Sequence, residues 1–237
     1  DFVLEIGPGI GTMTQYLAQA AGKVAAVEID KALIPILGDT LSAYDNVMII
    51  NEDVLKVDIQ KLVEEENGGR PVKVVANLPY YITTDVLTKL MNELPRAQSI
   101  AVMIQKEVGD KLLSSPGEDG YGPLAVMCQY HYNVVRALDV PAACFNPPPK
   151  VDSSFMVLER LETPYVDGGD EAVFTRLVRS AFAMRRKTLL NNLLSGFALN
   201  REQAASYLEA VGLSVQARAE ELSLEDFAKL SRQLQSL

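Results

Sequence analysis

The feature that most constrains the fold of this chain is a regular alternation of two sequence patterns in its first half. Short apolar runs rich in valine and isoleucine alternate with longer stretches that place apolar residues on one helical face. The apolar runs are Phe2 to Ile6, Lys23 to Glu28, Asn46 to Ile50, Val72 to Ala76 and Ser99 to Ile104. Because these runs are almost continuously apolar, they predict strands that are buried on both faces. The alternation therefore predicts an α/β fold with a mostly parallel sheet covered by helices.

The pattern changes in the second half, where two apolar runs follow each other without an intervening helix. Val134 to Val140 and Ser154 to Leu158 have the composition of strands, which predicts an antiparallel strand at the sheet edge. After Thr163 only helical patterns follow. The sequence therefore predicts two domains, a sheet domain over residues 1–162 and a small all-helical domain over residues 163–237.

The composition excludes several classes of protein. With 48% hydrophobic and 22% charged residues, the 237-residue chain is expected to fold and bury a core. No apolar run approaches the roughly 18 residues of a membrane span and no signal-peptide pattern is present, so we expect a cytoplasmic protein without a membrane partner. Two separated cysteines and one histidine predict neither a disulfide framework nor a zinc site. No metal is expected, and His131 is expected to be structural.

Charge is distributed unevenly along the chain. The net charge of -9, from 22 basic and 31 acidic residues, by itself argues against a polyanionic partner. Between Val173 and Arg201, however, the sequence has no acidic residue. The basic residues of this segment are Arg176, Arg179, Arg185, Arg186, Lys187 and Arg201. Such a segment favours contact with phosphate groups, although a solvated helix face can have the same composition.

A glycine-rich turn follows directly after the first predicted strand. The sequence from Glu5 to Gly11 places three glycines where open α/β sheets bind ligands, and glycine lets a ligand approach the backbone closely. Glu28 ends the second strand, and Glu52 and Asp53 follow the third. Carboxylates there can accept hydrogen bonds from ribose hydroxyls and an adenine amine, which suits NAD and S-adenosylmethionine equally. Singly, each feature has a structural alternative, namely a tight turn, a helix cap or a solvated charge.

The fourth predicted strand ends in Asn77-Leu78-Pro79-Tyr80, the most informative tetrapeptide in the chain. The lone pair of an adenine N6 is delocalised into the ring, so its attack on an electrophilic methyl group needs acceptors that hold the N–H groups. An asparagine oxygen and a backbone carbonyl fixed by the following proline are such acceptors. A tyrosine beside them can stack on a base pulled out of its helix. The alternative is a proline-containing turn with a tyrosine in the core.

Together these segments resemble a known family. The glycine turn, Glu28, Asp53 and the tetrapeptide resemble the S-adenosylmethionine-dependent rRNA adenine N6,N6-dimethyltransferases. The segment from Phe145 to Ser153 resembles the small-subunit (KsgA-type) members, and Phe182 to Asn192 resembles the start of their helical C-terminal domain. The resemblance covers essentially the whole chain. It implies a Rossmann-like methyltransferase sheet with an antiparallel edge strand, followed by a helical domain that binds rRNA.

The resemblance also implies roles for individual residues. The implied cofactor-binding residues are Glu5, Gly7, Gly9, Gly11, Glu28, Ile29, Asp53, Val54 and Asn77. Among them, Gly7 would hold the methionine part, Glu28 the ribose and Asp53 the adenine amine, with Ile29 and Val54 flanking the ring. The implied catalytic residues are Asn77, Leu78, Pro79, Tyr80 and Phe145, whose two aromatic rings would hold the flipped base. For Phe145, core packing is the alternative. The implied rRNA-binding residues are Arg176, Arg179, Arg185, Arg186 and Lys187.

The implied function is dimethylation of two adjacent adenosines near the 3′ end of small-subunit rRNA, with S-adenosylmethionine as methyl donor. The implied partner is this rRNA in a pre-ribosomal particle, and the implied state is a monomer. Family members have several dozen residues before the first strand, so a chain that starts at Asp1 is expected to be N-terminally truncated and to have impaired activity.

Three other functions remain open at this point. One is a large-subunit rRNA adenine methyltransferase of the macrolide-resistance type, against which the segment Phe145 to Ser153 and the acidic net charge count. The second is a non-catalytic factor that binds pre-ribosomal particles. The third is a nicotinamide oxidoreductase, which would leave the tetrapeptide Asn77 to Tyr80 unexplained.

Overall fold

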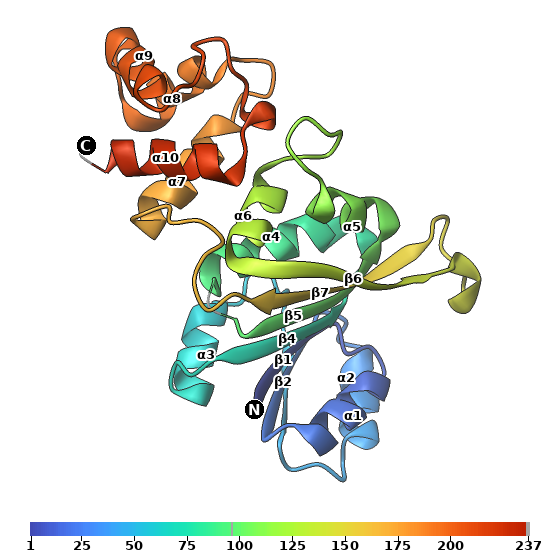
Figure 1. The fold of residues 1–237 in the computed structure, drawn as a ribbon. Coiled ribbons are helices and arrows are strands. Elements are labelled where there is room, and N and C mark those ends of the chain that lie inside the picture. The colour runs from blue at the N-terminus through green and yellow to red at the C-terminus, as the bar shows by residue number, and fades with distance from the viewer. Residues whose placement is uncertain (96, 236–237) are drawn as a thin grey trace. The chain divides into compact units, whose positions relative to one another are not determined.

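The computed structural model describes residues 1–95 and 97–235, and the predicted sheet is present. Within these residues, seven strands form one sheet in the order β3-β2-β1-β4-β5-β7-β6 (Figure 1). The first five are β1 (Phe2–Ile6), β2 (Lys23–Glu28), β3 (Val47–Asn51), β4 (Val72–Asn77) and β5 (Ser99–Gln105). They pair in parallel, as their continuous apolar sequences predict. The predicted bounds of these strands are confirmed to within one residue.

The last two strands complete the sheet on the side of β5. β7 (Ser153–Arg160) pairs antiparallel with β5, and β6 (Tyr132–Val140) lies beyond β7 at the edge. The register places Ile100 opposite Leu158 and Val102 opposite Met156, and all four side chains are buried. The predicted antiparallel strand is therefore confirmed, and apolar packing between these strands fixes its register.

Helices cover both faces of the sheet. They are α1 (Thr12–Ala20), α2 (Leu33–Thr40), α3 (Ile59–Asn67) and α4 (Thr83–Glu93), with short 3-10 turns η1 (Tyr80–Ile82) and η2 (Ala142–Cys144). α1 and α2 lie on one side of the strands and α3 on the other (Figure 1). Local signals set the bounds of α3, because Asp58 accepts a hydrogen bond from the Lys61 amide at its start and Gly68 is left-handed at its end.

The chain divides into two compact units. One contains residues 1–109 and 134–160, and the other contains residues 110–133 and 161–237. The change of unit at residue 161 lies beside the predicted boundary, but residues 110–133 pack with the helices rather than with the sheet. Residues 110–133 group with the helices because they contact residues beyond position 160, through both apolar and polar interactions. The Tyr130 ring stacks on Phe174 with centroids 3.8 Å apart, and the Leu161 amide donates to the His131 carbonyl over 3.0 Å. The assignment of functions to two domains stays a prediction.

The second unit is built from helices. They are α6 (Pro123–His131), α7 (Glu171–Ala181), α8 (Leu189–Phe197), α9 (Arg201–Ala210), η3 (Ala219–Glu221) and α10 (Leu224–Leu234). α5 (Lys106–Leu113), which the sequence did not predict, follows β5 and runs from the first unit into the second. Ser223 and Asp226 form a capping box at the start of α10. Phe174 and Phe227 are fully buried in this unit, which gives it a core of its own.

None of the helices in residues 1–95 and 97–235 is long and apolar enough to cross a membrane. The same part of the chain contains no group of three or more histidine, cysteine, aspartate or glutamate side chains that could hold a metal ion.

Candidate active site

The carboxyl ends of the parallel strands lie at one edge of the sheet and bring most of the predicted residues together. The Gly7 amide, after β1, donates to the Val27 carbonyl near the end of β2 over 3.0 Å. The Glu52 amide, after β3, donates to the Glu28 carbonyl over 3.1 Å. The ends of β1, β2 and β3 are therefore joined by backbone hydrogen bonds, at the position where open α/β sheets bind ligands.

The glycine turn has a shape that only glycine can adopt without strain. Gly7, Gly9 and Gly11 have φ angles of 73°, 61° and 88°. A β-carbon at Gly7 would also lie 3.4 Å from the Asn77 carbonyl oxygen. α1 begins directly after Gly11, with no side-chain cap at its N-terminus and no acidic residue in its first turn. The first amides of α1 can therefore bind an anionic group such as a carboxylate.

Glu28 connects this turn to the end of β2. Its side chain is only 6% exposed, and Oε2 accepts a hydrogen bond from the Gly9 amide over 3.1 Å. Oε1 accepts from the Asp30 amide over 2.9 Å. Because a carboxylate oxygen can accept more than one hydrogen bond, Glu28 keeps acceptor capacity for ribose hydroxyls while the protein fixes its orientation.

Asp53 lies after β3, where its carboxylate shapes the following turn. It is half-buried, and Oδ1 accepts a hydrogen bond from the Leu55 amide over 2.9 Å. Asn51, which sequence reasoning missed, donates from Nδ2 to the Glu28 carbonyl over 2.8 Å. This bond ties the end of β3 to the end of β2, so it sets the spacing of the two acids.

The two residues expected to flank an adenine ring differ strongly in exposure. Ile29 is 62% exposed, whereas Val54 is only 5% exposed. Ile29 therefore has apolar surface that a ring can cover, while Val54 contributes mainly to the core. Sequence position alone does not distinguish these cases, because both residues follow an acid at a strand end.

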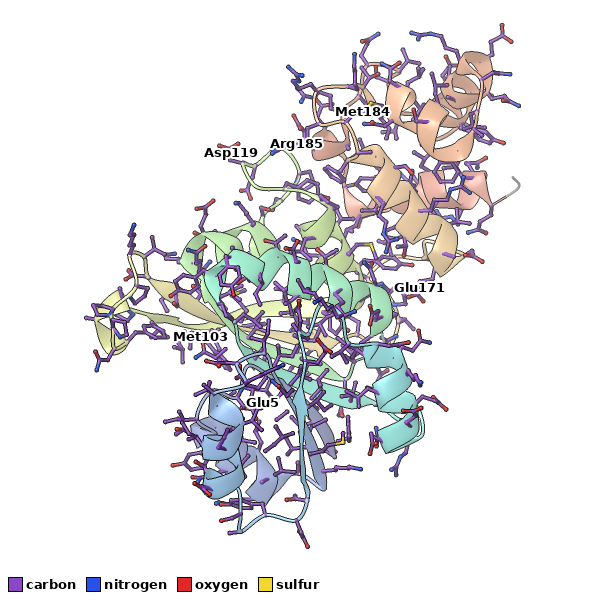
Figure 2. All side chains as sticks on the ribbon, turned by 180° about the vertical axis from the view of Figure 1, so that it is seen from behind. Glu5, Met103, Asp119, Glu171, Met184 and Arg185 are labelled. Carbon is purple, nitrogen blue, oxygen red and sulfur yellow. The ribbon has the colours of Figure 1, made fainter. Side chains whose placement is uncertain are left out.

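Glu5 lies on β1 among the central strands (Figure 2) and is fully buried. Neither of its carboxylate oxygens has a hydrogen-bond partner within the described residues. Burial raises the pKa of Glu5 from its ordinary value of 4.5 to about 7, and the Thr14 hydroxyl partly offsets this rise. That hydroxyl makes no hydrogen bond of good geometry, so its influence is weak. A cation bound at the glycine turn would favour the ionised form of Glu5.

The tetrapeptide begins with Asn77, the last residue of β4, at the same edge of the sheet. Asn77 is exposed, and the Leu78 amide donates to the Met103 carbonyl over 3.4 Å. Tyr80 begins η1 and is half-buried, so it is not a core residue. Its hydroxyl lies 2.7 Å from the hydroxyl of Ser153, the first residue of β7. Sequence reasoning placed Ser153 in a family-like segment but assigned it no role.

Phe145 lies just after η2 and is half-buried. Its amide donates to the Ala142 carbonyl over 3.1 Å, which closes the turn that precedes it. The expected alternative of a core residue does not describe this side chain, because part of it remains accessible. Phe145 belongs to the same compact unit as Tyr80.

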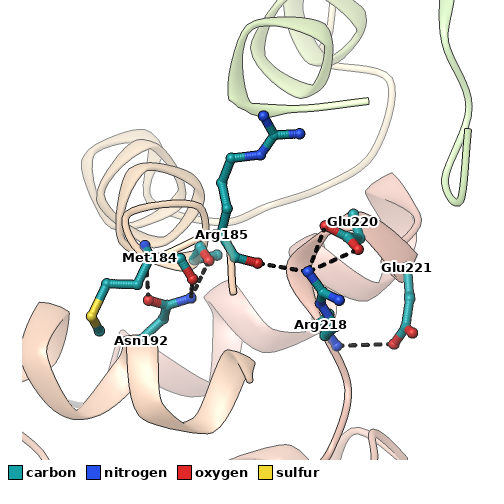
Figure 3. Close-up of polar contacts among 7 residues, drawn as sticks. Met184, Arg185, Asn192, Arg218, Glu220 and Glu221 are labelled. Carbon is teal, nitrogen blue, oxygen red and sulfur yellow. Dashed lines mark hydrogen bonds and ion pairs between the residues drawn. The ribbon is translucent and has the colours of Figure 1, made fainter. Parts of the chain in front are cut away.

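The predicted basic residues lie on α7 and on the segment that joins it to α8. All five are exposed, and Arg185, Arg186 and Lys187 are consecutive in the joining segment. Figure 3 shows two side chains that hold this segment, both missed by sequence reasoning. The buried Asn192 accepts from the Met184 amide over 3.2 Å, and Arg218 donates to the Arg185 carbonyl over 2.7 Å. The side chain of Arg185 extends away from these contacts (Figure 3).

Arg176 differs from the other predicted phosphate-binding residues. Its Nε and Nη2 donate to the Gly196 carbonyl over 3.0 Å and 2.8 Å, at the end of α8. Its guanidinium also lies 4.5 Å from the centroid of the Phe197 ring. These contacts stabilise the packing of α7 on α8, so Arg176 has a structural role whether or not it contacts RNA.

Solved structures of known proteins share this architecture. A crystal structure of a dimethyladenosine transferase from Plasmodium falciparum superposes with a TM-score of 0.77 at 24% identity, over 100% of this chain and 90% of that chain. A crystal structure of the 23S rRNA methyltransferase ErmE superposes with a TM-score of 0.67 at 26% identity, over 99% of this chain and 91% of that chain. The fold and the site at its strand ends define a Rossmann-like methyltransferase.

The sequence then identifies the family. The family model described as ribosomal RNA adenine dimethylase matches residues 1–236. A relative from Lachnoclostridium phytofermentans, named ribosomal RNA small subunit methyltransferase A, is 50% identical over 98% of this chain and 81% of that protein. A relative of the same name from Alkaliphilus oremlandii is 47% identical over 99% of this chain and 82% of that protein. This chain belongs to the ribosomal RNA adenine dimethylase family.

Family membership makes the chain an rRNA adenine methyltransferase that uses S-adenosylmethionine, and it overturns the nicotinamide oxidoreductase alternative. The residues present fit this cofactor. Gly7 has a left-handed backbone that favours glycine, Glu28 can accept from a ribose, and the orphaned carboxylate of Glu5 suits a cationic ligand. The roles of the individual residues stay predictions.

Proposed function

We propose that this chain dimethylates N6 of two adjacent adenosines near the 3′ end of small-subunit rRNA. The small-subunit assignment is supported by relatives of 45% to 50% identity that carry a small-subunit methyltransferase name. The substrate would be the rRNA within a pre-ribosomal particle, met in the cytoplasm by a monomeric enzyme.

The cofactor would be held along the ends of β1, β2 and β3. The turn at Gly7 and the first amides of α1 bind its amino-acid part, and Glu28 accepts hydrogen bonds from both ribose hydroxyls. Asp53 accepts from the adenine amine, with the exposed Ile29 against the ring. When bound, S-adenosylmethionine supplies an electrophilic methyl group.

The nucleophile would be positioned by the residues at the end of β4 and directly after it. The exposed Asn77 side-chain oxygen and the Leu78 carbonyl accept the two N–H groups of adenine N6. Pro79 restricts the backbone, so that this carbonyl keeps its direction. Held in this way, N6 becomes more pyramidal and its lone pair is directed at the methyl group. The methylated nitrogen is strongly acidic, so no side chain with a shifted pKa is needed to remove its proton.

The target base would be held outside its helix by two aromatic rings. Tyr80 and Phe145 are both half-buried, so each is supported by the protein and still offers ring surface. Stacking on such rings is worth roughly 1 to 3 kcal/mol per base, which offsets the cost of unstacking an adenosine.

The segment Arg185 to Lys187 would contact rRNA phosphates. It is exposed, carries three consecutive positive charges, and is anchored by Asn192 and Arg218. Because the rest of the chain is acidic, non-specific attraction to RNA is limited and contact is concentrated on this segment.

The observation that carries the proposal is the position of Asn77. Its backbone carbonyl oxygen would lie 3.4 Å from a β-carbon at Gly7, so the backbone of Asn77 lies beside the predicted cofactor turn. A methyl donor held by that turn and an adenine N6 held by Asn77 would therefore be neighbours. Proximity of this kind is what a direct transfer between the two groups requires.

The test is methyl transfer from radiolabelled S-adenosylmethionine to under-methylated small ribosomal subunits, with N6,N6-dimethyladenosine identified by mass spectrometry. We expect label in small-subunit rRNA and none in free large subunits, with Asn77→Ala as the inactive control. Label in large-subunit rRNA would instead support the macrolide-resistance type. Tight binding of small subunits without transfer would support the non-catalytic assembly factor.

A further inference from the structure

The segment from Phe145 to Ser153 resembles the small-subunit members of the family, yet only its first residue has a proposed role. In the structure its last two residues, Asp152 and Ser153, contact the elements that carry both proposed base-stacking rings. All of these residues belong to the unit that contains the sheet.

Ser153 contacts the first ring directly. It is fully buried, begins β7, and pairs with Gln105 at the end of β5. Its hydroxyl lies 2.7 Å from the Tyr80 hydroxyl. The strand pairing fixes the backbone of Ser153, so this hydrogen bond fixes the outer end of the Tyr80 ring. A tyrosine side chain rotates about only two bonds, and the anchor therefore determines which ring face is offered.

Asp152 acts on the second ring through the backbone. Its Oδ1 accepts a hydrogen bond from the Ala142 amide over 2.9 Å, at the first residue of η2. η2 ends one residue before Phe145, whose amide donates back to the Ala142 carbonyl. The Asp152 carbonyl in turn accepts from the Lys106 amide over 3.0 Å, which ties it to the end of β5. Asp152 thus links the turn before Phe145 to the sheet.

We propose that Asp152 and Ser153 are positioning residues that set the two base-holding rings, Tyr80 and Phe145, from one rigid point at the start of β7. The inference rests on the proposed function and adds the residues that orient its base-binding side. Asp152 directly precedes Ser153 and is itself tied to the end of β5, so the two residues move together and hold the two rings in a fixed relation before a base arrives. Preorganisation of this kind raises the rate of methyl transfer, because the base is bound in its reactive orientation.

The first test compares Ser153→Ala with Ser154→Ala in the full chain. Ser154 is the matched control, because it is the next residue of β7, is also fully buried, and donates its hydrogen bond to Asp139 over 2.5 Å rather than to Tyr80. On under-methylated small subunits we expect Ser153→Ala to lower kcat about threefold to tenfold, as loss of one hydrogen bond allows. Affinity for S-adenosylhomocysteine, measured by titration calorimetry, should stay unchanged. Equal kcat values for the two variants would overturn the proposal.

The second test changes Tyr80, the other partner in the hydrogen bond with Ser153. Tyr80→Phe keeps the ring and removes only the hydroxyl, without altering the buried strand. We expect it to lower kcat as much as Ser153→Ala does, and the double variant to be no slower than either single variant. Additive losses would show that the two hydroxyls act independently and would refute the anchoring role.

The role of Asp152 is tested by comparing a disruptive substitution with a conservative one. Asp152→Ala removes the acceptor for the Ala142 amide and should slow transfer, whereas Asp152→Asn keeps an oxygen there and should recover most of the lost rate. Equal rates for these two variants would remove Asp152 from the proposal. The parent chain separates this inference from the proposed function: if the parent transfers no methyl group the function itself fails, whereas an active parent with unaffected variants refutes only the positioning role.

Discussion

Buried Glu5 makes the stability of this chain depend on pH in a direction that can be calculated. Burial raises its pKa from 4.5 to about 7, so between these pH values the folded chain holds a proton that the unfolded chain has lost. Stability therefore falls as the pH rises through this window, and the loss is complete above the folded value. At about 1.36 kcal/mol for each pKa unit, a rise from 4.5 to about 7 corresponds to about 3 kcal/mol.

Glu5→Gln tests this reasoning, because the amide has nearly the same shape and stays neutral at every pH. The free energy of unfolding should be measured by urea denaturation from about pH 5 to about pH 9, for the variant and the parent. We expect the stability difference to grow in favour of Glu5→Gln across the window and to level off above pH 7. Thr14→Val should move the upper end of the window only slightly to higher pH, since the Thr14 hydroxyl lowers the pKa of Glu5 weakly. A stability difference between Glu5→Gln and the parent that is the same at all pH values would falsify the argument.

Three further predictions concern the proposed roles. Glu28→Ala should weaken binding of S-adenosylhomocysteine by roughly 1.5 to 3 kcal/mol in titration calorimetry, the range for a hydrogen bond to a charged group, and unchanged affinity would contradict the ribose assignment. Asn77→Ala should abolish methyl transfer in single-turnover assays with little change in cofactor affinity, and normal rates would remove it from the chemistry. Replacement of Arg185, Arg186 and Lys187 by alanine should make the salt dependence of small-subunit binding shallower by about 0.7 to 0.9 for each phosphate that is no longer neutralised, and an identical slope would identify a solvated surface.

Much of the sheet could be predicted because its strands have a simple local signal. The run from Val24 to Val27, for example, is apolar throughout and buried on both faces, as a central parallel strand requires. α5 was missed because it is short, largely charged, and contains Gly109, which disfavours a helix. The structure explains that glycine, since a β-carbon there would lie 3.1 Å from the Met156 sulfur. A packing constraint of this kind leaves no trace in local periodicity.

In the candidate site, too, some residues could be predicted from the sequence, whereas others depend on contacts made only in the folded chain. Glu28, Asp53 and Asn77 could be placed because strand ends in a parallel sheet meet at one edge. Asn51, the partner of Glu28, and Ser153, the partner of Tyr80, could not, because they act through hydrogen bonds that depend on the folded geometry. The burial of Val54 was equally hidden, since exposure depends on neighbours that are distant in the sequence.

The position of β7 has a consequence for how the chain assembles during synthesis. β6 is made before β7, yet β7 lies between β5 and β6, so the outer edge of β5 stays open until residues 153–160 have been made. An open strand edge invites pairing with other chains, which makes the growing polypeptide vulnerable at this stage. The strand ends that face the predicted methyl donor belong to β1 through β4 and are complete much earlier. The anchor of Tyr80 arrives only with Ser153, so the side of the site that would receive RNA is the last part of the sheet to form.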